Sequence, residues 1–193
     1  MSSPPQNPPF DLTIARAIGA VIPGRSESTE CETIGLFDEY RDRLLRYVVS
    51  IGLSVHDGED VVQEVFLSLF RHLKMGRSRD NLRGWVFRVA HNLALKKRNG
   101  NQKRLASIGV EQSIALAGAD SGTNPETQFE NNERRRRLLA VMQALAEQDR
   151  WCLYLRAEGL RYREIAAVVG ISLGSVSNSL AKSMERLMRE NER

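Results

Sequence analysis

Two short amphipathic segments joined by a glycine lie in the C-terminal third of the chain, and they constrain its fold more than any other feature. In residues 162–169 the apolar side chains recur at helical spacing, and Gly170 can adopt the left-handed conformation that ends a helix. Ser172 is placed to cap the next helix. The predicted buried stripe of that helix is Val176, Leu180, Met184 and Leu187. Such a pair is typical of a helix-turn-helix, which places its second helix in the DNA major groove.

Two other interpretations of this segment are weaker. A plain helical hairpin in a bundle has the same apolar stripes, but the glycine turn, the cap and both stripes agree on DNA binding. Residues 170–174 also match the Gly-x-Ser-x-Gly nucleophile elbow of α/β-hydrolases, which requires a strand before the serine. A helical segment precedes Ser172 here, so we interpret this serine as a cap and not as a nucleophile.

The rest of the chain also has helical periodicity and shows no β-strand alternation, so we predict an all-α protein. Upstream helices are predicted over 34–51, 56–73 and 82–99. We predict two small helical domains joined by a flexible linker, the C-terminal one a helix-turn-helix. The predicted divisions are a mobile extension (1–32), a helical domain (33–100), an acidic linker (101–132) and the helix-turn-helix domain (133–193). Within the last, helices are expected over 133–146, 149–158, 162–169 and 173–190.

Two of the upstream helices have predicted core faces. On the 56–73 helix this face is Val61, Val62, Val65, Phe66, Leu69, Phe70 and Leu73. On the 82–99 helix it is Leu82, Trp85, Val86, Val89 and Leu93.

Charge is distributed unevenly along the chain. Residues 71–104 contain 11 basic side chains and one acidic one, whereas residues 38–64 contain three basic and seven acidic ones. A basic block beside an acidic block favours two different partner surfaces. Two cysteines are too few for a disulfide framework, the three histidines lack metal-ligand spacing, and no 18-residue apolar run occurs. We therefore predict no enzymatic activity, no cofactor, no membrane insertion and a cytoplasmic location.

Each charged block contains one candidate surface. Arg88, Asn92 and Lys96 share a helix face, and their basic surroundings favour nucleic acid over an ordinary solvated face. The opposite side of the 56–73 helix mixes acids with an exposed leucine, and composition leaves a protein-docking face and an ordinary surface equally open. Its residues are Asp60, Gln63, Glu64, Leu67 and Arg71.

Three segments, in order, resemble one protein family. Residues 53–66 closely resemble region 2 of bacterial sigma factors, and residues 82–94 resemble the promoter-melting helix of the extracytoplasmic-function (ECF) group. Residues 155–166 are similar to the C-terminal DNA-binding domain of that group. The resemblance implies an alternative sigma factor, which binds core RNA polymerase and directs it to promoter DNA. Such proteins usually act under an anti-sigma factor, which the sequence does not identify.

The resemblance also implies a role for each surface. The Asp60 to Arg71 face would dock on the coiled coil of the largest polymerase subunit. Arg88 and Asn92 would lie at the −10 element, with Asn92 reading an unstacked base, and Lys96, Lys97 and Arg98 would hold the DNA backbone. The recognition helix would read the −35 element through Ser175, Ser177, Asn178, Ser179 and Lys182. The acidic linker would lie in the path of nascent RNA.

The recognition helix departs from the group because it lacks the usual arginines and lysines after residue 176, which leaves Lys182 as its main charge. Phosphate neutralisation dominates DNA affinity, so we expect weaker −35 binding than is usual. The alternative function is a helix-turn-helix regulator that acts without polymerase, which leaves the 57–71 face and the basic segment unexplained. A degenerate family member that only sequesters partners is a further alternative. A phosphorelay output protein would need an α/β receiver pattern, which the sequence lacks.

Overall fold

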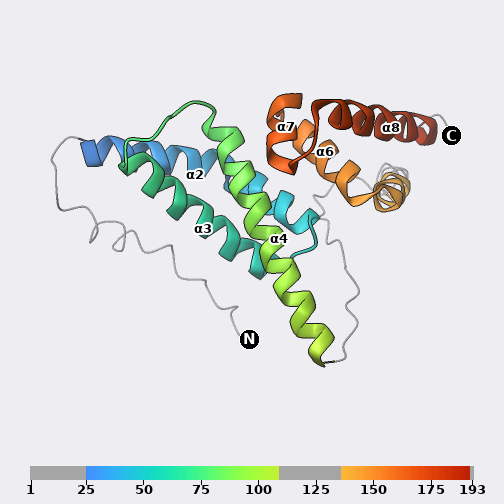
Figure 1. The fold of residues 1–193 in the computed structure, drawn as a ribbon, viewed down its shortest axis with the longest axis horizontal. Helices are drawn as coiled ribbons and strands as arrows, with labels where there is room; N and C mark the ends of the chain where they lie inside the picture. The colour runs from blue at the N-terminus through green and yellow to red at the C-terminus, as the bar shows by residue number, and fades with distance from the viewer. Residues whose placement is uncertain (1–24, 109–135, 192–193) are drawn as a thin grey trace, which may run out of the picture.

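The computed structural model describes residues 25–108 and 136–191, which form two helical units packed against each other (Figure 1). The first unit contains α2 (Arg25–Ser50), α3 (Val55–Lys74) and α4 (Leu82–Ile108). The second contains a helix over 136–144, then α6 (Glu147–Ala157), α7 (Tyr162–Val169) and α8 (Leu173–Asn191). Every regular element in the described ranges is a helix, which confirms the predicted all-α class.

The first unit is held together by a close crossing of α2 and α3. Ser54 begins α3, since its hydroxyl accepts a hydrogen bond from the Asp57 backbone N–H at 3.1 Å. Gly58 lies against α2, where an added Cβ would come 3.0 Å from Leu45 and 3.1 Å from Val48. Glycine at this position therefore allows the two helices to approach, and the apolar face of α3 is buried against α2 and α4.

Two helices of the first unit extend beyond their predicted ends. α2 begins at Arg25, within the predicted extension, where Thr29 is buried and accepts a hydrogen bond from the Thr33 hydroxyl at 2.8 Å. α4 continues to Ile108, and the Asn101 amide donates to the Asp57 carboxylate at 3.0 Å. The Asn101 contact ties a turn of α4 that has no apolar periodicity to α3. The rest of the predicted extension and linker, 1–24 and 109–135, lies outside the described residues.

α4 is buried on two sides, which differs from the single face predicted for it. It runs between α2 and α3 on one side and the second unit on the other, where it packs mainly on α7 (Figure 1). The fully buried positions therefore include Phe87, Ala90, His91 and Ala94, which the sequence did not indicate. The predicted residues Leu82, Trp85, Val89 and Leu93 are only half-buried, as is Phe70 of α3.

The second unit packs α6, α7 and α8 around one apolar centre. Its fully buried side chains include Leu155, Leu160, Ile165 and Val176. The prediction that Met184 belongs to this core is wrong, because 46% of the residue is exposed. Ser183 is buried instead, since it follows Val176 and Leu180 at the helical spacing of seven and three residues.

Among the described helices, no single one has both the length and the apolar composition to cross a membrane. The bent pair formed by 162–169 and 173–189, which turns by 104°, matches by length and composition only.

Candidate polymerase and DNA surfaces

The predicted docking face of α3 is exposed along its whole length. All five of its residues are exposed, and Leu67 retains 39% of its surface at the centre of the face. Arg71 lies 3.7 Å from Glu64 in an exposed ion pair, and the other acid of this face, Asp60, lies 2.7 Å from the Lys97 ammonium. The face therefore presents one apolar side chain among charged and polar ones, a composition suited to a partner that is both polar and partly apolar.

The candidate −10 surface lies on the side of α4 that is covered neither by α2 and α3 nor by the second unit. Arg88, Asn92 and Lys96 are all exposed there. The adjoining loop is held by His72, whose Nε2 lies 2.8 Å from the Ser78 carbonyl and whose ring lies 4.8 Å from that of Trp85. These contacts fix the loop next to the exposed stripe.

The start of α4 is fixed by a close contact between an asparagine and a glycine. Asn81 has a positive φ of 53° and accepts a hydrogen bond from the Gly84 N–H at 3.0 Å. A Cβ at Gly84 would lie 2.4 Å from the Asn81 amide, so this cap requires glycine. The two residues therefore set the point at which the basic loop becomes the α4 helix.

Lys97 connects the two candidate surfaces of the first unit. Its ammonium lies 2.7 Å from Asp60 and 3.0 Å from Asp57, both on α3. These hydrogen bonds raise the pKa of Lys97, and the one to Asp60 has the larger effect. Two carboxylates therefore neutralise the charge of Lys97 in this structure, and we do not assign Lys97 to DNA.

Arg98 does not occupy the DNA-backbone position expected from the sequence. Its guanidinium donates to the Ile51 carbonyl at 3.0 Å and pairs with both oxygens of Glu147 in α6, at 3.1 and 3.2 Å. It also lies 5.8 Å from the centre of the Trp151 ring, and only 16% of its side chain is exposed. In this arrangement Arg98 is therefore a contact between the two units, and its predicted contact with the DNA backbone requires the units to separate.

The helix-turn-helix has the geometry that its sequence predicts. Gly170 adopts the left-handed conformation with φ 77°, and its N–H donates to the Ala166 carbonyl at 2.9 Å. The Ser172 hydroxyl accepts from the Ser175 N–H at 3.0 Å and so caps α8. At the start of α7 the Glu164 carboxylate accepts from the Arg161 N–H, which supplies the hydrogen bond that a serine at this position would otherwise make.

The predicted reading residues of α8 do not all share one exposed face. Ser177, Asn178 and Lys182 are exposed, and Ser175 is half-buried with its hydroxyl 2.8 Å from that of Ser172. Ser179 is only 4% exposed and donates to the Asp149 carboxylate at 2.6 Å. The prediction that Ser179 reads DNA is therefore wrong for this arrangement, because its hydroxyl is buried between helices.

Ion pairs between described residues, among them three that involve arginines of the first unit, join the two helical units. Arg43 of α2 lies 2.5 Å from the Glu158 carboxylate and also donates to its backbone carbonyl at 2.8 Å. Arg83 lies 3.5 Å from Glu164, and Arg98 pairs with Glu147 as described. Each of these pairs is only partly exposed, so charge complementarity orients the two units against each other.

A buried histidine lies at the centre of this contact. His91 of α4 is 2% exposed, and its ring lies 4.9 Å from Trp151 of α6, edge to face. Burial holds the pKa of Tyr47 well above its usual value, and its hydroxyl lies 2.8 Å from His91 Nδ1, within hydrogen-bond distance. Burial, aided by the charge of Arg98, lowers the pKa of His91 to about 4. The histidine is therefore neutral at pH 7.

We expect acidification to destabilise the protein through His91. Its pKa falls from 6.5 to about 4 on folding, so its contribution is intact above pH 6.5 and is lost as the pH falls toward 4. Between pH 7.5 and 5 the free energy of unfolding should fall by about 2 kcal/mol from this group. Urea titrations of the wild type and His91→Gln test this, since glutamine does not titrate. Equal pH dependence in the two proteins would contradict the prediction.

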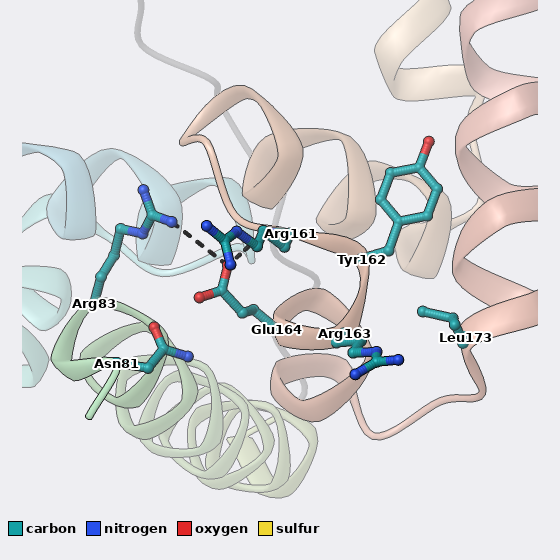
Figure 2. A pocket seen from close by; sticks show the side chains of 7 residues that line it. All are labelled: Asn81, Arg83, Arg161, Tyr162, Arg163, Glu164 and Leu173. Carbon is teal, nitrogen blue, oxygen red and sulfur yellow. Dashed lines mark hydrogen bonds and ion pairs between the residues drawn. The ribbon is translucent and has the colours of Figure 1, made fainter.

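A pocket of about 640 Å³ lies between the units, at the starts of α4 and α7 (Figure 2). It is lined by Asn81, Arg83, Arg161, Tyr162, Arg163, Glu164 and Leu173. The residues that the structure describes contain no cluster of three or more metal-ligating side chains, in this pocket or elsewhere. Three arginines and one carboxylate give the pocket a positive charge, which suits an anion and not a cation.

Comparisons with known proteins agree with the sequence pattern. The Sigma-70 region 2 family matches residues 36–104, and the family Sigma-70, region 4 matches residues 135–187. The chain is 28% identical over 155 residues to the ECF RNA polymerase sigma factor SigE of Mycolicibacterium smegmatis, a match that covers 79% of this chain and 58% of that protein. It is 30% identical over 138 residues to the ECF RNA polymerase sigma-E factor of Escherichia coli, covering 68% of this chain and 72% of that one.

Two solved structures have a similar fold. CnrH, in complex with the cytosolic domain of CnrY, matches with a TM-score of 0.51 and 20% identity, covering 93% of this chain and 96% of CnrH. The sigma factor RpoE of Bartonella quintana, in complex with the anti-sigma factor NepR, matches with a TM-score of 0.56 and 21% identity. The match covers 82% of this chain and 97% of that one. With both sigma-70 regions in order and a relative at 30% identity, the chain belongs to the ECF group of RNA polymerase sigma factors, which are transcription initiation factors and not enzymes.

Proposed function

We propose that this sigma factor binds core RNA polymerase through the exposed face of α3 and opens the −10 element with the exposed stripe of α4. The observation that carries the proposal is that the two faces are exposed on α3 and α4, which pack against each other in one unit. Leu67 is the apolar centre of the first face, and Arg88, Asn92 and Lys96 form the second. A polymerase bound to α3 would thus hold the α4 stripe against DNA, where its charge offsets the free energy of unstacking.

At the −35 element, α8 enters the major groove with its first turns. Asn178 and Ser177 are exposed there, and Lys182 supplies one charge a turn further along. The asparagine amide can pair with both hydrogen-bonding groups of adenine in the groove, which makes Asn178 the main specificity residue of α8.

The two asparagines provide an experiment on this assignment. Asn178→Ala should remove base preference at one −35 position, and Asn92→Ala should remove it at one −10 position, each by about 5- to 150-fold, or 1–3 kcal/mol. Transcription from a library of promoter variants measures both preferences. Asn99→Ala, at another exposed asparagine of α4, is the matched control and should change neither. Unchanged preferences in both test variants would refute these assignments.

The two units must separate on promoter DNA. Elements named −35 and −10 are about 25 base pairs apart, which is about 85 Å of B-form helix. In the structure the first residue of α8, Leu173, lines the same pocket as Asn81 at the start of α4. The two DNA-binding surfaces therefore lie too close together to reach both elements. The 27 residues of 109–135 can span at most about 90 Å by covalent geometry, which is long enough for the separation.

Breaking one ion pair between the units should favour separation. Arg43→Glu and Glu158→Arg each place two like charges together. Each should weaken the closed arrangement, in which the two units are packed against each other, by about 2 kcal/mol. The radius of gyration from small-angle scattering should rise in each single variant and fall back in the double reversal. A radius unchanged in both single variants would mean that this pair does not hold the units together.

The chain has the partners of its family, and we propose a cytoplasmic location for it. Core polymerase and promoter DNA are both cytoplasmic in bacteria. Burial raises the pKa of the Cys152 thiol, and a protonated, buried thiol suits a structural and not a redox role. We also propose an anti-sigma protein as a regulatory partner. The solved structures of similar fold support this, since RpoE is bound there to an anti-sigma factor.

A further inference from the structure

The recognition helix of this chain is short of positive charge for a protein that binds duplex DNA. On the exposed positions of α8 from Leu173 to Lys182, the lysine is the only cation. Neutralisation of phosphates supplies most of the affinity of a protein for duplex DNA. Charge for the −35 duplex is therefore expected elsewhere on this unit, close to the end of α8 that enters the groove.

Two arginines at the start of α7 fit that requirement. Arg161 and Arg163 are exposed, and no carboxylate among the described residues forms an ion pair with either guanidinium. The single acid of their pocket, Glu164, accepts a hydrogen bond from the Arg161 backbone N–H at the start of α7, and two arginines against one carboxylate leave a positive charge even without Arg83. Figure 2 shows both side chains at the pocket together with Leu173. The pocket thus contains positive charge that the protein itself does not neutralise.

The position of these arginines matches the path of the DNA backbone. In a helix-turn-helix the second helix enters the major groove while the first helix crosses the phosphate backbone. Leu173, the first residue of α8, lines the same pocket as Arg161 and Arg163, so the arginines lie beside the groove-entering end of α8. A guanidinium can donate two parallel hydrogen bonds to one phosphate, which a lysine cannot.

We propose that Arg161 and Arg163 form a phosphodiester-binding site for the backbone of the −35 duplex, next to the bases that α8 reads. The positive charge that α8 lacks is thus supplied by α7. In the closed arrangement Asn81 and Arg83 cover one wall of this site, so DNA takes their place when the units separate. The proposal rests on the proposed −35 function of the second unit.

The test uses holoenzyme assembled from core polymerase and the full chain, bound to a duplex promoter fragment at several salt concentrations. Arg161→Gln and Arg163→Gln should each lower the slope of log K against log salt by about one, and the double variant by about two. The loss should be equal for all −35 sequences, whereas Asn178→Ala should alter sequence preference and leave the slope unchanged. Arg186→Gln, which removes an exposed charge near the far end of α8, is the matched control.

Two further measurements separate the possible failures. On a premelted template that lacks a −35 element, both arginine variants should initiate like the wild type. Reduced initiation there would mean that the variants damage the sigma function itself, which overturns the assignment to −35 DNA. An unchanged salt slope on the duplex overturns it as well. If inorganic phosphate then bound the free wild-type protein and not the double variant, the site would belong to a free anion.

Discussion

Leu67→Asp should abolish the binding of core RNA polymerase and, with it, all transcription that depends on this chain. Leu67 is the apolar centre of the α3 face and lies among acidic side chains. A hot-spot residue at the centre of an interface accounts for about 2 kcal/mol or more, which is about 30-fold in affinity, and we expect Leu67 to be such a residue. The aspartate also places a carboxylate in the contact beside Asp60 and Glu64, and a buried charge without a partner adds to the loss.

Fluorescence titration of labelled protein with core polymerase measures the effect. Ile34→Asp is the matched control, because Ile34 is an exposed apolar residue of α2 with 49% of its surface exposed. This control should bind within about twofold of the wild type, as expected for a surface change away from the interface. Leu67→Asp binding as tightly as Ile34→Asp would show that polymerase does not dock on α3.

Phe87→Ala should destabilise the protein by about 3–5 kcal/mol, a large part of the typical total of 5–15 kcal/mol. The Phe87 side chain is fully buried, and its ring packs edge-on against Tyr47 and Tyr40, with centroids 5.7 and 6.4 Å apart. Alanine would leave a cavity where α2 meets α4, next to the rings of Tyr40 and Tyr47. The structure offers no simple way to close that cavity.

Chemical denaturation followed by circular dichroism measures this loss. Phe87→Leu is the control, because it keeps most of the apolar volume and should cost less than about 1.5 kcal/mol. A destabilisation below about 1 kcal/mol for Phe87→Ala would mean that α4 is not anchored through this ring.

The sequence predicted best what local interactions determine. The α7 helix, the Gly170 turn and the start of α8 match the prediction to the residue, since a left-handed glycine and a serine cap act within one turn. The exposed faces of α3 and α4 also follow from helical periodicity alone. The upstream end of α2 did not follow, because Thr29 and Glu32 are held by polar contacts and not by an apolar stripe.

What the sequence missed depends on contacts between the two units. Periodicity predicts one buried face for a helix, so it could not show that His91 is covered by Trp151 of the second unit. Arg98 and Ser179 are typical DNA-contacting residue types, but their partners, Glu147 and Asp149, both lie on α6. A residue type and its spacing do not determine which of two polar partners, protein or DNA, the side chain meets.

Run-off transcription tests the central claim most directly. Purified core polymerase, with fragments from the host genome as templates, is assayed with the wild-type chain, with Leu67→Asp and without either. We predict specific start sites that appear only with the wild-type chain, preceded by common −35 and −10 sequences. No such start sites, from a chain that still binds duplex DNA, would contradict the account and identify a helix-turn-helix regulator that acts without polymerase.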